Sequence, residues 1–361
     1  MEEKTTANYY SLNNFDIIRL LAALQVVVVH LITHFRLSSL DWIVKILSPF
    51  PGVPVFFFVS GLLISAAWER NPSLNKFFLN RFYRIYPGLW GCIIFAVLSV
   101  VILADTELIS QNTGTFLLWI FAQSTILQMW NPEFLKGYGL GAVNGALWTI
   151  AVEICFYLFV PILYWIYRIV KIRRIIILLI ITSLSFSLNY FLEYGLDREL
   201  KDCIAIKAIL LTPFPWVGMF CVGIFANNNL NYLVSILSGR FLPVLCVFML
   251  FAIVPFFVPR NIFFGFGNHI GLVNYFLLCA LILSGAFTNK TLATSLLKKH
   301  DLSYGIYIYH QPLLNVFLVL GFVSMSGLIL CLMFVILLAF ISWKFIERPV
   351  LNLKKSSLHK R

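Results

Sequence analysis

The chain has 361 residues, of which 60% are hydrophobic and only 12% are charged, and it carries a formal net charge of +12. Because soluble domains are about 25% charged, this chain has too few charged side chains to cover a water-facing surface. The composition therefore excludes a soluble globular protein and predicts an integral membrane protein whose solvent is lipid.

Ten apolar runs follow one another along the chain, and most are long enough for a helix to cross about 30 Å of hydrocarbon. A shorter apolar stretch at 116–129 predicts a re-entrant or interfacial segment, because a full crossing would place the basic segment 168–174 outside. The predicted fold class is all-α: a polytopic bundle of about ten transmembrane helices plus this short segment. The ten runs are approximately 17–35, 50–68, 85–104, 145–166, 174–192, 206–226, 241–258, 268–287, 303–322 and 324–345.

The basic residues lie mostly in short segments between these runs, as expected for loops that stay in the cytoplasm. We therefore expect contacts with membrane lipids and no nucleic acid partner. The basic segments after the second run and at 168–174 place both termini in the cytoplasm. The predicted divisions are a cytoplasmic N-terminal tail at 1–14, a membrane domain at 15–350 and a basic cytoplasmic C-terminal tail at 351–361.

The first run contains Arg19 and His30, and an ionisable residue inside a span is a functional hypothesis by default. The two are eleven residues apart, close to three helical turns, so they share a face about 16 Å apart along the axis. His34 lies one turn beyond His30 on the same face, and its role is left open. The alternative is an arginine that snorkels to the interface and a histidine that bonds a neighbouring helix.

The glycines and serines near the second run and the cysteines are expected to serve packing. Gly52 and the pair Ser60–Gly61 predict close contact between helices, because small residues let helices approach. Most of the seven cysteines lie in apolar runs without C-x-x-C spacing, so they are expected to be buried small hydrophobic residues. The sequence predicts neither a metal site nor a disulfide framework.

Glu153 lies in an apolar run and has no basic residue one turn away, so its carboxylate needs a partner on another helix. By the predicted topology its depth is similar to that of His30. His310 lies among tyrosines that include Tyr304, ahead of Pro312, and is expected nearer the cytoplasmic half than His30. A structural ion pair for Glu153 and a packing cluster for His310 are the alternatives.

Arg81 and Arg84 lie at i, i+3 on the helix that enters the third run. With the aromatic residues between them they make a suitable edge for phosphate groups. The alternative is that the charges of Arg81 and Arg84 only fix the orientation of the chain in the membrane and contact anionic lipid.

In their order along the chain, these residues resemble the acyltransferase-3 family of bacterial membrane acyltransferases. The resemblance covers about 12–350. Thr149 and Ala151 replace serines usual in the family, and Gln311 stands where tryptophan is common. The fused extracytoplasmic hydrolase-like domain of some relatives is not expected. The matching elements are Arg19 through His30, the Phe-rich Ser-Gly run at 55–65, Arg81 with Arg84 and Pro87, Leu147 and Trp148 with Glu153, Phe156 and Tyr157, Ser303 and Tyr304 with His310 and Pro312, and Phe345 with Glu347, Arg348 and Pro349.

The resemblance implies transfer of an acyl group, usually acetyl from acetyl-CoA, to a hydroxyl of an extracytoplasmic or lipid-linked glycan, in the bacterial plasma (inner) membrane. His30 is then expected to be the general base, and Glu153 to orient its tautomer. Direct transfer and an acyl-enzyme intermediate both stay open, as do acetyl, succinyl and longer acyl groups. The expected ligands are acetyl-CoA at Arg19, Arg81 and Arg84, the acceptor at His310, Tyr304 and Trp148, and no metal.

Two other classes of function fit part of the pattern. A secondary transporter or flippase for an anionic or lipid-linked substrate would also place ionisable residues within the membrane, although no inverted repeat is visible. A structural or regulatory membrane subunit would need no ordered set of ionisable residues. Binding of acetyl-CoA discriminates between an acyltransferase and these alternatives.

Overall fold

A computed structural model describes residue 10 and residues 13–170, 172–258, 262–297 and 300–358. The predicted tail residues 1–9, the basic residues Lys171, Lys298 and Lys299, and 359–361 lie outside this part. Every regular element among the described residues is a helix, which confirms the all-α prediction. Short 3-10 turns lie at Ser38–Leu40, Glu133–Leu135, Gly145–Leu147, Val254–Phe256 and Gly267–His269, and a π-helical turn lies at Trp343–Glu347.

The α-helices follow the predicted apolar runs, and each of the ten runs overlaps at least one of them. In chain order they are α2 (Phe15–His34), α3 (Asp41–Leu47), α4 (Gly52–Arg70), α5 (Leu74–Leu103), α6 (Thr106–Gln111), α7 (Thr113–Gln123), α8 (Trp148–Ile169), α9 (Arg174–Tyr194), α10 (Arg198–Asp202), α11 (Ile204–Leu210), α12 (Val217–Asn228), α13 (Leu230–Leu237), α14 (Phe241–Ile253), α15 (Leu272–Phe287), α16 (Leu292–Leu297), α17 (Ser303–Val319), α18 (Met325–Ser342) and α19 (Arg348–Leu358).

Six helical segments in the described residues are long and apolar enough to cross a membrane, which supports an integral membrane protein. A seventh candidate is the pair α12 and α13, which is bent by 86°. Helices α14, α15 and α17 have 13, 16 and 17 residues and are shorter than the six. The count of ten spans therefore stays a prediction.

The predicted re-entrant or interfacial stretch forms α7, which has only 11 residues. At 1.5 Å per residue it is about 17 Å long, too short to cross about 30 Å of hydrocarbon. Helix α5, in contrast, has 30 residues and is about 45 Å long. Its polar N-terminal part, which carries Arg81 and Arg84, therefore extends beyond the apolar length that a membrane requires.

The helices form two compact units. The first contains residues 1–25, 46–74 and 155–300, and the second contains residues 26–45, 75–154 and 301–361. Because α2 and α8 each contribute to both, the units alternate along the chain. They are described separately below.

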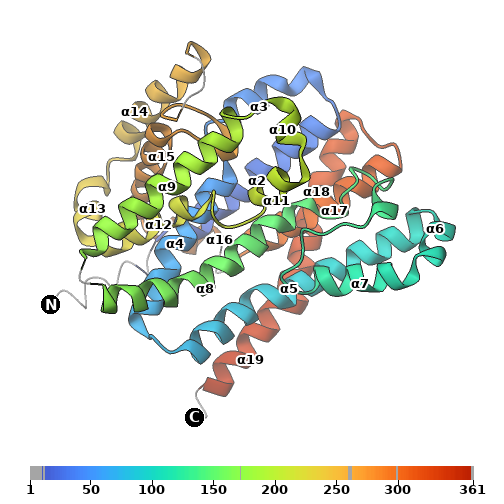
Figure 1. Cartoon of the computed structure of the whole chain (residues 1–361), viewed down its shortest axis with the longest axis horizontal. Helices are drawn as coiled ribbons and strands as arrows, with labels where there is room; N and C mark the ends of the chain where they lie inside the picture. Colours follow the sequence, from blue (N-terminus) through green and yellow to red (C-terminus); the bar gives the residue numbers. More distant parts are fainter. Residues whose placement is uncertain (1–9, 11–12, 171, 259–261, 298–299, 359–361) are drawn as a thin grey trace. The chain divides into compact units, whose positions relative to one another are not determined.

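The first unit is built around the close approach of α4 and α12, which lie side by side in Figure 1. A methyl group added at Gly61 would lie 2.1 Å from the carbonyl oxygen of Phe220, and one added at Gly223 would lie 2.2 Å from that of Phe58. Only glycine allows the two backbones to meet at this distance. The prediction that Gly61 serves helix packing is confirmed.

The same unit fastens the start of α2 through a buried asparagine. Asn14 is 3% exposed, and its side-chain N–H group lies 3.0–3.1 Å from the carbonyl oxygens of Gly285, Thr288 and Asn289. Its Oδ1 accepts from the N–H of Ala293 at 3.0 Å. One side chain thus bonds the backbone groups that have no partner within the helix where α15 ends.

The second unit packs α17 against α18 and against α5 (Figure 1). The loop 124–147 covers these helices, and its Leu135, Tyr138 and Val143 are buried against α5 and α7. Asn315 on α17 holds the loop, because its Oδ1 accepts from the N–H of Leu140 and its Nδ2 donates to the carbonyls of Ala142 and Val143. Buried loop backbone needs such partners.

We predict that Gly61→Ala destabilises the first unit by about 1–3 kcal/mol, because the added methyl group has no space against α12. The measurement is the temperature at which the purified protein in detergent loses its monodisperse peak. Gly114→Ala on α7 is the matched control, since a methyl group there meets nothing within 4 Å. Equal thermal stability of the two variants would contradict the packing role of Gly61.

Candidate active site

The second unit brings two predicted site residues into direct contact. His30 on α2 and His310 on α17 lie with Nδ1 and Nε2 3.0 Å apart, and their ring centroids are 5.1 Å apart. The expectation that His310 lies nearer the cytoplasmic half than His30 is wrong. His310 is the eighth residue of a helix of 17 residues, so it lies near mid-helix, level with the His30 ring.

The two histidines differ in their surroundings. His310 is 0% exposed, and its Nδ1 also bonds the backbone carbonyl of Tyr307 on the preceding turn. His30 is only half-buried, and the ring of His34 lies beside it with centroids 5.7 Å apart. Of the pair, His30 is therefore the more exposed ring.

A proline determines how α17 is held at this turn. Pro312 has no N–H, so the carbonyl of Ile308 loses its helical donor. Asn144 donates from Nδ2 to that carbonyl at 2.9 Å, and the Cys92 thiol lies 3.2 Å from it. The loop before α8 and the middle of α5 are thereby fastened to the part of α17 that carries His310.

Glu153 belongs to the same part of the second unit, and its predicted role in orienting the His30 tautomer stays a prediction. Thr149, one turn earlier on α8, lies 2.8 Å from the Tyr307 hydroxyl, and the Glu153 carboxylate acts electrostatically on that hydroxyl. The partner of the His30 Nδ1 in the structure is His310. Trp148 begins α8 and is half-buried, and its contact with an acceptor stays a prediction.

The contacts of Tyr304 are those of a packing residue. Its hydroxyl donates to the carbonyl of Ile85 at 2.9 Å, and its side chain is 7% exposed. A methyl group at Gly88 would lie 2.8 Å from its ring. Tyr304 therefore joins α17 to α5, and its predicted role in binding the acceptor stays untested.

The predicted phosphate-binding arginines are partly engaged within the protein. Arg84 pairs through Nη2 with Oδ2 of Asp301, whose Oδ1 accepts from both the N–H and the hydroxyl of Ser303. Asp301 thus accepts from the first backbone N–H of α17 and ties this helix to α5. Arg81 lies over the ring of Phe77, 5.8 Å from its centroid. Arg19 lies in the first unit, and its part in donor binding stays a prediction.

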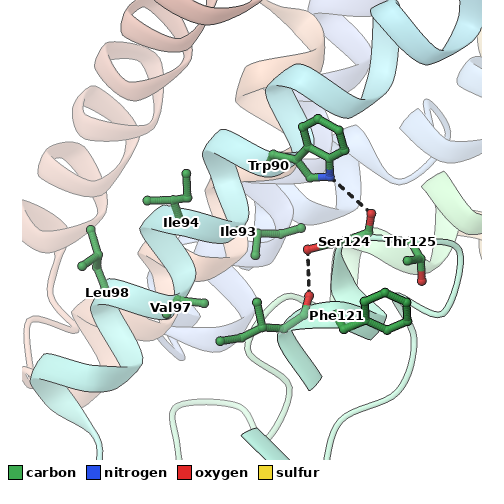
Figure 2. Close-up of a pocket in the computed structure, with 9 residues that line it drawn as sticks. Trp90, Ile93, Ile94, Val97, Leu98, Phe121, Ser124 and Thr125 are labelled. Carbon is green, nitrogen blue, oxygen red and sulfur yellow. Dashed lines mark hydrogen bonds between the residues drawn. The ribbon is translucent and has the colours of Figure 1, made fainter. Parts of the chain in front are cut away.

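A shallow apolar groove between α5 and α7 lies elsewhere in the second unit (Figure 2). It has a volume of about 660 Å³, and Trp90 bridges its two walls by donating from Nε1 to the carbonyl of Ser124 at 3.3 Å. No ionisable side chain lines it among the described residues. It therefore offers no group for proton transfer, and the histidine pair is the candidate active site.

The candidate site includes Asn144, Thr149 and Asp301, which the sequence did not predict as site residues. Thr149 was noted only because it replaces a serine usual in the family, and Asp301 had a local signal, since an aspartate can bond the N–H groups at the start of a helix. Asn144 and Thr149 gain their roles from contacts with α17 more than 150 residues away. No group of His, Cys, Asp or Glu in the described ranges could hold a metal ion.

Comparison with known proteins shows the family of this chain. A family model described as an acyltransferase domain matches residues 12–344. The chain belongs to this family. The resemblance to the acyltransferase-3 family and the prediction of an acyltransferase are thereby confirmed. The transporter and structural-subunit hypotheses gain no support from the comparison.

The relatives of this acyltransferase include proteins of similar length. Nodulation protein 10 of Rhizobium leguminosarum bv. viciae is 29% identical, over 97% of this chain and 96% of that protein. An O-acetyl transferase of Shigella phage Sf6 is 25% identical, over 94% of this chain and 96% of its own length. The peptidoglycan O-acetyltransferase OatA of Listeria monocytogenes is 23% identical over 93% of this chain, which spans only 55% of OatA. No solved structure matches the chain.

We predict that Arg84 and Asp301 are energetically coupled. Arg84→Ala and Asp301→Ala should each lower thermal stability, and the double variant should lose less than the sum, with a coupling of about 1–2 kcal/mol. The measurement is a double-mutant cycle by thermal unfolding in detergent. The exposed pair Lys136 and Glu133, with side chains 60% and 84% exposed, is the matched control and should show a much smaller coupling. Strictly additive losses for Arg84 and Asp301 would contradict the pairing.

Proposed function

We propose that this protein is a membrane-bound O-acyltransferase that moves an acyl group, most simply acetyl from cytoplasmic acetyl-CoA, to a hydroxyl of an extracytoplasmic or lipid-linked glycan. The observation that carries the proposal is the contact between His30 and His310 inside a helical membrane protein of the acyltransferase family. The names of the relatives support acetyl transfer, since two of them are O-acetyltransferases and one of these acts on peptidoglycan.

In the proposed reaction, His30 is the general base. It takes the proton of the acceptor hydroxyl as the oxygen attacks the thioester carbonyl, forming the C–O bond. The C–S bond then breaks, and His30 returns the proton to the departing thiolate, so that an alcohol and a thioester become an ester and a thiol. An acyl-enzyme route would divide the same exchange into two steps. Glu153 would add negative potential that stabilises the imidazolium of His30.

The donor is proposed to bind through Arg19, Arg81 and Arg84, because the phosphates of coenzyme A require cations. Arg84 is proposed to bind the donor beside its ion pair with Asp301. The acceptor side is proposed to include Trp148, with the buried Tyr304 and His310 as supporting residues.

The proposed topology places this chemistry in the bacterial plasma (inner) membrane. Ten spans with both termini in the cytoplasm would put the N-terminal part of α5 on the donor side. The basic tail 351–361 and the N-terminal tail 1–14 would lie on the same side, flanking a membrane domain at 15–350. The excess of basic residues in the short segments supports this orientation.

We expect His30→Gln to lower the rate of acyl transfer about 10²–10⁴-fold, because glutamine cannot take up the proton. The measurement supplies the protein in nanodiscs with acetyl-CoA labelled in the acetyl group and with total membrane glycans, and follows label into the glycan fraction. His269→Gln is the matched control, since His269 bonds Asn189 and lies in the first unit. Undiminished transfer by His30→Gln would exclude His30 as the base.

We expect Arg81→Ala to raise the KM for acetyl-CoA about tenfold or more and to change kcat less, since a lost charged hydrogen bond is worth about 1.5–3 kcal/mol. Steady-state kinetics with varied acetyl-CoA measure this. Lys136→Ala serves as the control, because its segment is expected on the opposite face of the membrane. An unchanged KM in Arg81→Ala would remove Arg81 from the donor site.

A further inference from the structure

The bonds of the His310 ring determine which of its nitrogens carries the proton. A carbonyl oxygen can only accept a hydrogen bond, so the Nδ1 that bonds the Tyr307 carbonyl must be an N–H donor. Because His310 is 0% exposed, a charged imidazolium there would be costly and the ring is neutral. A neutral ring with its proton on Nδ1 has a lone pair on Nε2.

That lone pair determines the state of the second ring. Nε2 of His310 lies 3.0 Å from Nδ1 of His30, and one of two nitrogens at this distance must donate. Since Nε2 of His310 has no proton, Nδ1 of His30 is the donor. In a neutral His30 the remaining lone pair is then on Nε2.

We propose that His310 is a positioning residue that holds His30 in the tautomer with the proton on Nδ1, leaving Nε2 as the base of the reaction. This deepens the proposed function and rests on it. It also assigns to a buried histidine the role that a carboxylate plays in catalytic triads.

Helix α17 is suited to hold the His310 ring still. Tyr307 is bonded through its hydroxyl to Thr149, and the carbonyl of Ile308 is held by Asn144. Both contacts lie within the turn that precedes His310. The ring is therefore fixed by its own two hydrogen bonds and by the anchoring of the helix at Tyr307 and Ile308.

The hydrogen-bonded chain orients His30 but does not conduct protons. It ends at the carbonyl of Tyr307, which cannot take up a proton, so His310 has no group to which it could pass one. When His30 takes the acceptor proton on Nε2, its Nδ1–H continues to donate to the lone pair of His310. The imidazolium is thus stabilised without any movement of the second ring.

The tautomer can be read directly from the ¹⁵N spectrum of the full chain labelled in its histidines and reconstituted in nanodiscs. The His30 signals are those lost in His30→Gln. We expect His30 in the wild type with Nδ1 protonated and Nε2 unprotonated. Glu153→Gln is the matched control and should leave this tautomer unchanged, whereas the opposite tautomer in the wild type would overturn the proposal.

Two variants of His310 distinguish a loss of His30 orientation from misfolding of the protein. In His310→Gln the amide oxygen lies as many bonds from Cβ as Nε2 does and can accept from His30, so the tautomer is kept and kcat falls less than about tenfold. His310→Ala removes the acceptor, so both tautomers of His30 appear and kcat falls about 100-fold or more while KM stays within about twofold. Retention of both the tautomer and kcat in His310→Ala would overturn the proposal. If the wild type transferred no acyl group, the proposed function would fail, and the wild-type spectrum alone would still decide the tautomer.

Discussion

In hydrocarbon a polar group without a partner costs several kcal/mol, and this constraint organises much of the described chain. Asn14 shares its two amide hydrogens among three carbonyl groups and accepts from one N–H where α15 ends. Asn315 does the same for the loop before α8, and Asn144 replaces the donor that Pro312 removes from α17. In each case one amide side chain joins segments that are far apart in sequence. The bundle is thus held by a few buried asparagines as well as by apolar packing.

The candidate active site follows from the same constraint. Two imidazole rings inside a membrane helix bundle need partners, and each supplies one for the other. The Tyr307 carbonyl completes the arrangement, so that the buried ring uses both its nitrogens and the half-buried ring keeps one for chemistry. In the proposed mechanism, the satisfaction of buried polar groups therefore also sets which nitrogen of His30 carries the proton. In the catalytic triads of soluble hydrolases, a buried carboxylate is the partner of the histidine. A charged carboxylate is more costly to bury in lipid than a neutral imidazole ring.

The fold class and the positions of most helices could be predicted from sequence, because an apolar run longer than about 18 residues is typical of a membrane-spanning helix and of little else. The candidate site could be predicted only in part. His30 and His310 stood out as ionisable residues in apolar runs, but their contact depends on how α2 and α17 pack, which no local pattern encodes. The predicted depth of His310 relative to His30 was wrong for that reason. The ion pair of Arg84 with Asp301 was missed, because the two residues are separated by 217 positions. In its local sequence each resembles an ordinary charged residue of a loop at the membrane surface.

The central claim is that His310 acts on the reaction only through His30. A double-mutant cycle on the rate of acyl transfer tests this most directly, with His30→Gln, His310→Ala and the variant that carries both substitutions. The account predicts that the double variant is no slower than His30→Gln alone, because His310 has nothing left to orient. If the two losses multiplied instead, His310 would act on the substrate or on the fold independently of His30, and the account would be contradicted.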